Sequence, residues 1–181
     1  MSDWRPKFRP EHFYFVTTSA VDSLHIFRRD VIKRLLVDTL DCFCHHKRMR
    51  LFGFVIMPNH LHFIARFSAT DPMASVVRDF KRQTADRVIR HLKAEENQTA
   101  LVELRARVKR LEKQRYKVWE DGYNAKDVVS ETFLLQKMEY IHNNPCQPHW
   151  SLCKKARVLY LVKRAVLYDE FGVYYSDRRC A

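Results

Sequence analysis

The sequence predicts an α+β fold in which an antiparallel sheet carries helices on one face. Along the 181 residues, short runs rich in aromatic and β-branched residues alternate with longer runs whose apolar residues recur at helical spacing. Two of the apolar runs are separated only by residues 57–60, and the proline and asparagine in this gap favour an antiparallel hairpin. The expected order is β-α-β-β-α-β with a further helix, which is the ferredoxin-like plan.

The first half of the chain is expected to supply three strands and the first helix. Residues 12–19, with the sequence HFYFVTTS, have the composition of a strand. Residues 30–45 carry apolar residues at the spacing of an amphipathic helix. Residues 51–56 and 61–67 are the apolar strands of the hairpin.

The second half is expected to add two helices around one strand. Residues 72–90 show helical periodicity, and residues 118–128 are expected to hold the last strand, with Trp119 in the core or the sheet. Residues 131–144 form the final helix. Pro145 ends it, because proline cannot continue a helix and restricts the residue before it.

The charge balance suggests a polyanionic partner. The chain has 33 Lys and Arg against 21 Asp and Glu, a formal net charge of +12, which favours nucleic acid as the first candidate. A solvated charged face is the alternative for the basic stretch between residues 78 and 117. With 3 glycines and neither GxGxxG nor GxxxxGK[ST], the sequence has no nucleotide-cofactor fingerprint.

The cysteines and the apolar content indicate the compartment. The chain has 5 cysteines and no CxxC pair, and the polar, basic N-terminus lacks the apolar stretch of a signal peptide. No run of about 18 apolar residues is present, so no membrane partner is expected. We therefore expect a cytoplasmic protein with free thiols.

His60 and His62 form the first candidate site. Side chains alternate along a strand, so both imidazoles project from one side of the sheet and can reach one metal ion. With 9 histidines in 181 residues, chance alone gives about 0.45 such pairs. Two half-exposed histidines without a metal are therefore the alternative for this pair taken alone.

Tyr140 and Asn144 form the second candidate site. They are four residues apart on the final helix, so the phenol and the carboxamide share one face. The alternative is a packed tyrosine followed by an asparagine that ends the helix before proline.

Both motifs together resemble a known family. The stretches PNHLHF at residues 58–63 and YIHNNP at residues 140–145 are similar to those of the single-tyrosine transposases with a His-hydrophobic-His motif. Within that superfamily the chain most resembles the REP-associated tyrosine transposases, over about residues 12–150. Two departures are the charged segment 91–117, longer than the family's usual link, and the segment 146–150 in place of a glycine-containing one.

The resemblance implies a mechanism. His60 and His62 match the metal-binding pair, Asn144 the third ligand, and Tyr140 the nucleophile. The implied activity is Mg²⁺- or Mn²⁺-dependent cleavage and joining of single-stranded DNA at repetitive palindromic hairpins through a 5′-phosphotyrosine. A phenol with a pKa near 10 is a weak nucleophile, and a metal held by neutral ligands keeps the positive charge that the reaction needs.

The resemblance also divides the chain and suggests its partners. Residues 1–150 are expected to form the catalytic domain, with a charged helical insertion at about 91–117. Residues 151–181 are expected to form a basic tail that packs on or extends it.

Single-stranded or hairpin DNA is the expected partner of a monomer or homodimer. The expected DNA-binding residues are basic and lie on the second helix, the N-terminal arm and the tail: Arg78, Lys81, Arg82, Arg5, Lys7, Lys154, Lys155 and Arg157. The alternative function is a non-catalytic module that binds structured DNA or RNA.

Overall fold

Four strands and four α-helices make up the described part of the chain. The computed structural model describes residues 6–10, 12–110, 112, 114–150 and 152. The strands and α-helices are β1 (Phe13–Ser19), α1 (Asp30–His45), β2 (Met49–Ile56), β3 (His60–Phe67), α2 (Met73–Ala94), α3 (Gln98–Ala106), β4 (Asn124–Val128) and α4 (Glu131–Asn143). Short 3₁₀ turns occupy Val21–Ser23, Ile26–Arg28 and Asn144–Cys146.

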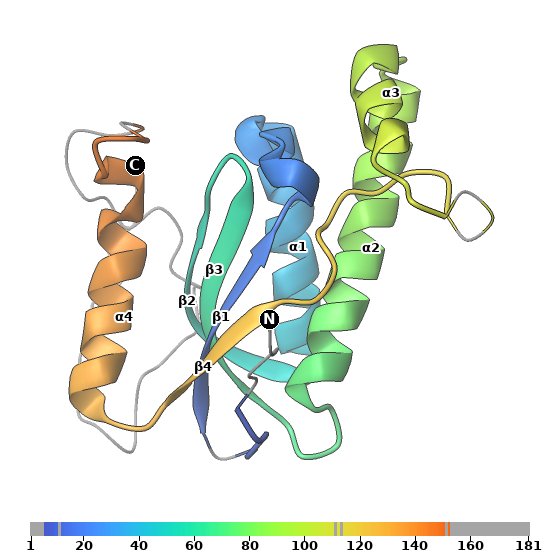
Figure 1. Cartoon of the computed structure of the whole chain (residues 1–181). Helices are drawn as coiled ribbons and strands as arrows, with labels where there is room; N and C mark the ends of the chain where they lie inside the picture. The colour runs from blue at the N-terminus through green and yellow to red at the C-terminus, as the bar shows by residue number, and fades with distance from the viewer. Residues whose placement is uncertain (1–5, 11, 111, 113, 151, 153–181) are drawn as a thin grey trace.

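The strands form one antiparallel sheet in the order β2-β3-β1-β4 (Figure 1). β1 lies in the middle and pairs with β3 on one side and with β4 on the other. This order, with α1 between β1 and β2 and α2 between β3 and β4, is the predicted ferredoxin-like arrangement.

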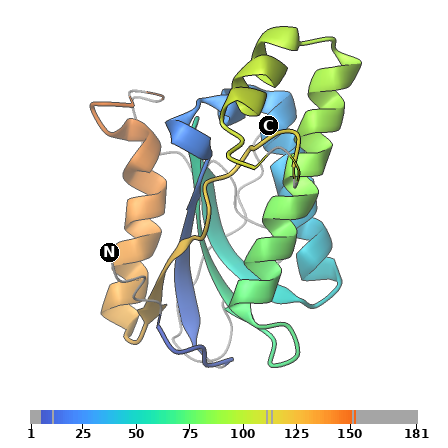
Figure 2. The ribbon, with the colours of Figure 1, turned by 45° about the vertical axis from the view of Figure 1, so that its right-hand side comes forward.

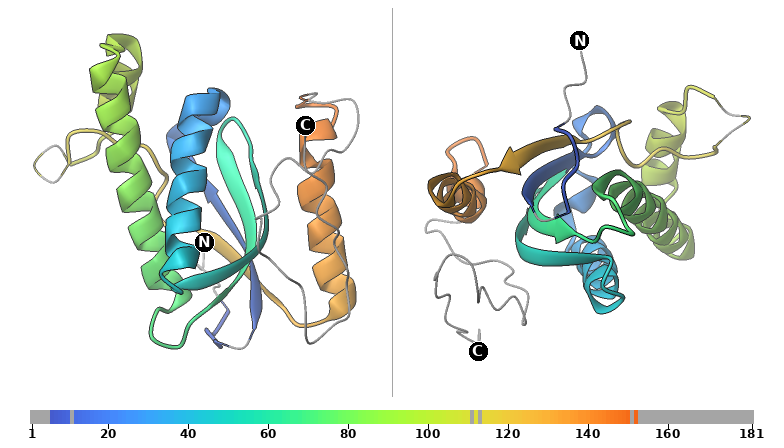
Figure 3. Two further views of the ribbon diagram at one scale, coloured as in Figure 1. Left: turned by 180° about the vertical axis from the view of Figure 1, so that it is seen from behind. Right: turned by 90° about the horizontal axis from the view of Figure 1, so that it is seen from below.

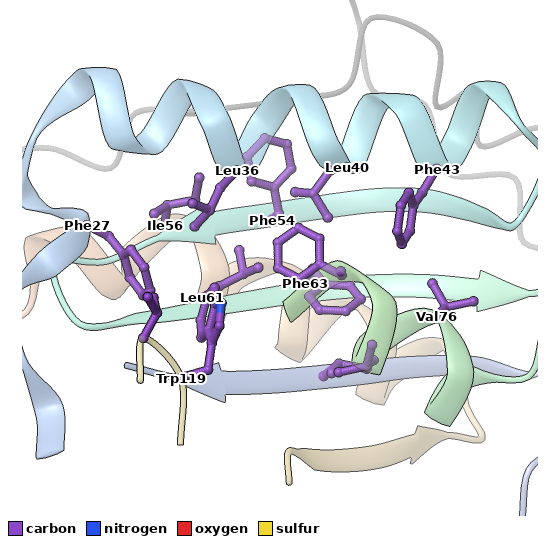
Figure 4. Close-up of a cluster of buried hydrophobic side chains, with 14 of the residues drawn as sticks. Phe27, Leu36, Leu40, Phe43, Phe54, Ile56, Leu61, Phe63, Val76 and Trp119 are labelled. Atoms are coloured by element: carbon purple, nitrogen blue, oxygen red, sulfur yellow. The ribbon is translucent and has the colours of Figure 1, made fainter. Parts of the chain in front are cut away.

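Helices α1 and α2 cover one face of the sheet and enclose the larger core. Figure 4 shows Leu36, Leu40 and Phe43 of α1 directed at side chains of β2 and β3. Val76 of α2 belongs to the same cluster. Alternate residues of β1 and β3 supply this face, and in β2 the alternation changes at a register shift between Leu51 and Gly53, so that Met49, Leu51, Phe54 and Ile56 all lie on it.

Helix α4 packs on the opposite face, which Figures 1 and 2 show on the side of the sheet away from α1 and α2. Its buried residues Leu134, Met138 and Ile141 meet a second apolar cluster on β1, β2, β3 and β4. Gly53 of β2 permits this approach, because a Cβ there would lie 3.2 Å from Sδ of Met138. The sheet is therefore covered on both faces, and among the described α-helices only the tyrosine-bearing α4 packs on the second face.

The β2–β3 hairpin is fixed by backbone hydrogen bonds at its turn. The Met57 N–H donates to the His60 carbonyl at 2.8 Å, which closes the hairpin. The loop after β1 is tied to the same turn, since Ala20 N–H donates to Asn59 O at 2.7 Å and Phe27 N–H to Pro58 O at 2.9 Å. These bonds hold the start of β3 in a defined place.

The charged segment 91–117 is partly structured. Helix α2 continues to Ala94, beyond the predicted end at residue 90. Asn97 then caps α3, its side chain accepting from the Ala100 N–H at 3.1 Å, and Leu104 is fully buried. Figure 3 shows α3 beside the end of α2, far from α4. No helix among the described residues is long and apolar enough to span a membrane.

The last strand fills only the end of the segment that was predicted to hold it. We expected it within residues 118–128, but β4 begins only at Asn124. Trp119 makes a single bridge to Ala20 and is buried in the core, as expected, where its indole N–H donates to the Thr84 hydroxyl at 3.0 Å. Because this side chain packs between the sheet and α2, the chain there does not follow the β1 edge as a regular strand.

Candidate active site

His60 and His62 lie on the face of the sheet that α4 covers. The antiparallel register places His62 opposite Thr17 of β1 and His60 opposite Ser19. Leu61 points to the other face, where it is fully buried. The two imidazole rings therefore meet on one side, with centroids 4.6 Å apart.

His62 is buried and has a neighbour at each ring nitrogen. Its Nδ1 lies 2.8 Å from Oγ1 of Thr17, and its Nε2 lies 3.5 Å from the Tyr140 hydroxyl. Burial lowers the pKa of His62 to about 3, with smaller contributions from His60 and Lys137. The imidazole is therefore neutral at physiological pH.

His60 is oriented by the residue before it. Its Nδ1 lies 2.6 Å from Oδ1 of Asn59, and because an amide oxygen only accepts, Nδ1 carries the proton and Nε2 keeps its lone pair. Burial lowers the pKa of His60 to about 4, with a smaller contribution from His149. Both histidines are therefore in the uncharged form that binds metals.

Tyr140 reaches the histidines from α4. The helix starts at Ser130, whose hydroxyl accepts from the Phe133 N–H at 3.2 Å, an ordinary N-cap. Apolar contacts of the helix with the sheet then direct Tyr140 toward His62, with ring centroids 5.2 Å apart. The tyrosine is 42% exposed, so a polymeric substrate can reach its hydroxyl.

Asn144 follows Tyr140 by one helical turn, and its N–H donates to the Tyr140 carbonyl. Its side chain is 3% exposed, and its Oδ1 has no hydrogen-bond partner among the described residues. A buried amide oxygen without a partner costs about 1–3 kcal/mol, so such an atom in a folded protein calls for an explanation. Amide oxygens are also ligands for hard divalent cations.

These residues fit a divalent cation. Among the described residues no group of three His, Cys, Asp or Glu side chains could hold a metal ion, so a third ligand here has to be of another type. Two neutral imidazoles, each with a partner at Nδ1, and the unpartnered Oδ1 of Asn144 supply nitrogen and oxygen donors. Such a mixed, uncharged set can hold a divalent cation and leaves coordination positions for phosphate oxygens.

Two lysines on the face of the sheet that carries Tyr140 were not predicted. Lys137 of α4 places its ammonium 5.7 Å from the Tyr140 ring centroid. Lys126 of β4 lies close enough to lower the pKa of Lys137 further, after burial. The sequence could have indicated Lys137 but not Lys126, because Lys137 lies three residues before Tyr140 on one helix and therefore shares its face.

An aromatic group beside His60 was also missed. The Trp150 ring lies 5.6 Å from the His60 ring and 5.8 Å from the His25 ring, measured between centroids. Trp150 belongs to the segment 146–150, where the sequence departs from the family pattern. That departure was the available signal, since it replaces a small stretch with a large ring.

Arg78 and Arg82, predicted to bind DNA, lie on α2. Both side chains are exposed, and each makes an ion pair with Asp79 at 3.4 and 3.6 Å respectively. Because α2 packs on the face of the sheet opposite α4, these arginines lie across the sheet from the two histidines.

Lys81 has a structural contact. Its ammonium donates to the carbonyl groups of Glu120 and Gly122, so it anchors the segment that leads into β4. Lys7 is exposed in the described part of the N-terminal arm. The other predicted DNA-binding residues lie outside the described residues: Arg5, Lys154, Lys155 and Arg157.

A solved structure shows the same fold. A REP-associated tyrosine transposase bound to a REP hairpin matches with a TM-score of 0.55 and 15% identity, over 83% of this chain and 76% of that one. A candidate transposase from Deinococcus radiodurans R1 matches with a TM-score of 0.47 and 19% identity, over 79% of this chain and 97% of that one. No curated protein sequence matches the chain.

A sequence family accounts for most of the chain. The family of IS200-like transposases matches residues 12–144, from the start of the sheet to the asparagine after the tyrosine helix. The match includes the hairpin with both histidines and the helix with Tyr140. The chain therefore belongs to the IS200-like transposase family.

Proposed function

We propose that the chain cleaves and rejoins single-stranded DNA with Tyr140 as its nucleophile and a divalent cation as its cofactor. The observation that carries this proposal is the position of the Tyr140 hydroxyl, 3.5 Å from Nε2 of His62. Asn144, with its unpartnered Oδ1, follows one turn later on the same helix. A nucleophile beside a candidate metal ligand is the arrangement that phosphoryl transfer to a side chain requires.

The covalent step can be written from the atoms present. The Tyr140 oxygen forms a bond to the phosphorus of a phosphodiester, and the bond from that phosphorus to the 3′-oxygen breaks. The phenolic proton is released and the leaving oxygen takes up a proton. The products are a 5′-phosphotyrosine and a free 3′-hydroxyl, and attack by another 3′-hydroxyl reverses the step.

His60, His62 and Asn144 are the residues that would hold Mg²⁺ or Mn²⁺, and the bound ion would polarise the phosphodiester and balance its developing charge. Thr17 and Asn59 support this role by binding Nδ1 of the two histidines, so that Nε2 is the nitrogen of each imidazole that would bind the cation; at His62 the cation would take the place of the Tyr140 hydroxyl.

The proposed substrate is single-stranded DNA that contains a hairpin. The similar structure of a REP-associated tyrosine transposase was solved with a REP hairpin, and we propose the same class of DNA for this chain. The formal charge of +12 supports a nucleic-acid partner, because phosphate neutralisation supplies most of the affinity of such proteins.

The experiment is a covalent-capture assay with a hairpin oligonucleotide that carries single-stranded flanks. A 3′-end label is expected to become attached to the protein in Mn²⁺, while a 5′-end label leaves on a free fragment. Tyr140→Phe removes only the hydroxyl, so it should bind the oligonucleotide and form no adduct. Binding without any adduct by the unmodified chain would instead favour a non-catalytic DNA- or RNA-binding module.

A further inference from the structure

Lys137 is held among three aromatic rings. Its ammonium lies 4.9 Å from the centroid of Phe133, 5.3 Å from that of Phe15 and 5.7 Å from that of Tyr140. Contacts of this kind favour a cation over a ring face and hold its position. The long side chain therefore reaches the nucleophile with much of its conformational freedom already removed.

A second cation faces the same place. Lys126 of β4 pairs with Phe15 in the sheet, so both residues point to the α4 face. Burial lowers the pKa of Lys137, and the charge of Lys126 lowers it further. The neighbouring Asp127 points to the opposite face, where it meets His12 at 2.8 Å.

Neither lysine has an acidic partner among the described residues. The ion pairs of α2, such as that of Arg90 with Asp86, show that basic residues elsewhere in the fold are neutralised locally. Two neighbouring ammonium groups repel each other, and partial burial of Lys137 adds a desolvation cost. An anion that binds between them would relieve both costs.

We propose that Lys137, with Lys126 beside it, binds a backbone phosphate of the DNA strand at the cleavage point. This inference rests on the proposed function, in which Tyr140 attacks a phosphodiester. Lys137 precedes Tyr140 by three residues and shares its helix face, so a strand that reaches the hydroxyl passes the ammonium. The lysine contact adjoins the cation site without supplying a ligand to it: Lys137 lies one turn before Tyr140 on the helix and Asn144 one turn after it, and the charge of Lys137 contributes to the lowered pKa of His62.

The first test measures binding without chemistry. In a Tyr140→Phe background with a chelator present, Lys137→Met is expected to weaken oligonucleotide binding by about tenfold, the effect of removing one charge-assisted hydrogen bond. Methionine keeps an apolar stem over the rings, and Lys137→Arg should retain most of the affinity. The matched control is Lys93→Met on α2, which also removes an ammonium from above a ring, that of Tyr116. The control should change affinity by less than twofold.

The second test identifies the phosphate. A neutral methylphosphonate is placed in turn at each phosphate across the cleavage point. At one position the substitution and Lys137→Met should be non-additive, because each removes the same interaction. Additive effects at every position, in a variant with a cooperative melt, would overturn the proposal.

These experiments can reject the role of Tyr140 and the role of Lys137 independently of each other. The binding arms contain no covalent step, so a non-additive position supports the lysine site even if the unmodified chain forms no adduct. Adduct formation together with additive effects would leave Tyr140 as nucleophile and remove Lys137 from DNA binding.

Discussion

The Tyr140 hydroxyl and Nε2 of His62 lie 3.5 Å apart, although the two residues are separated by 78 positions in the chain. The helix and the strand that carry them belong to different layers, and the apolar contacts of Met138 and Ile141 set the distance between those layers. The same nitrogen is a proposed metal ligand. Nucleophile and cation therefore share one neighbour, and the surroundings of His62 control both.

Thr17 is expected to control metal affinity through His62. Thr17→Val removes the hydroxyl that binds Nδ1 and should weaken Mn²⁺ binding by about 10- to 100-fold, the usual effect of removing such a supporting hydrogen bond. Calorimetric titration of the DNA-free protein with Mn²⁺ measures it. Thr18→Val is the matched control, since the Thr18 hydroxyl is buried without a partner among the described residues and points to the other face. Equal affinities in both variants would contradict the assignment.

Asn144 is expected to contribute to metal binding but little to the stability of the metal-free protein. Asn144→Leu removes a buried oxygen that has no partner among the described residues, so the metal-free protein should lose less than about 1 kcal/mol of unfolding free energy. The rise in melting temperature that Mn²⁺ gives the parent protein should disappear. Melting curves with and without Mn²⁺ test both parts. A variant that keeps the full Mn²⁺-dependent shift would exclude Asn144 as a ligand.

The two histidines predict how stability depends on pH. Their pKa values in the folded protein are lowered to about 4 and about 3, against 6.5 when unfolded. Below pH 6.5 the unfolded chain binds protons that the native state excludes, so stability falls as the pH decreases from 7 to 5. Replacing His60 and His62 by Gln should flatten this slope, with a difference on the order of 4 kcal/mol at pH 5, about half of it from each histidine. Denaturant unfolding at three pH values measures it, and an unchanged slope would refute the burial argument.

Of the basic residues of α2, Arg78 and Arg82 are expected to bind DNA, and Lys81 is expected to stabilise the fold. Arg78→Ala and Arg82→Ala should leave the melting temperature unchanged, and each should reduce the salt dependence of DNA binding by about one unit of slope for every phosphate that the arginine neutralises. Lys81→Met should instead lower the melting temperature, because two backbone carbonyls lose their donor. Affinities at several salt concentrations, combined with melting curves, distinguish the two. A stable Lys81 variant with a reduced slope would restore this lysine as a DNA-binding residue.

Local signals were sufficient to predict most of the fold. The hairpin, the periodic helices and the end of α4 before Pro145 depend on residues close in sequence, and the structure confirms them. The start of β4 depends on the tertiary contacts of Trp119. Those partners include Thr84 on α2, which is 35 residues away, so no local pattern marks the end of the irregular segment.

The site could be predicted only in part. Residue spacing places His60 and His62 on one face and Tyr140 one turn before Asn144, but the resemblance to a family was needed to bring the two pairs together. Lys137 was missed because a lysine on a partly exposed helix looks like any solvated residue. Its distinguishing neighbour, the Phe15 ring, comes from the first strand and becomes visible only in three dimensions.

The two apolar clusters on either side of the sheet have a consequence for local opening. The central strands β1 and β3 are hydrogen-bonded on both edges and buried between helices on both faces, whereas α4 is joined to the sheet mainly through the smaller cluster. Amide protons of α4 should therefore exchange with solvent well before those of the central strands. His60 and His62 would then persist in place after Tyr140 and Asn144 have come loose, so heating should abolish cleavage below the temperature at which the sheet itself melts.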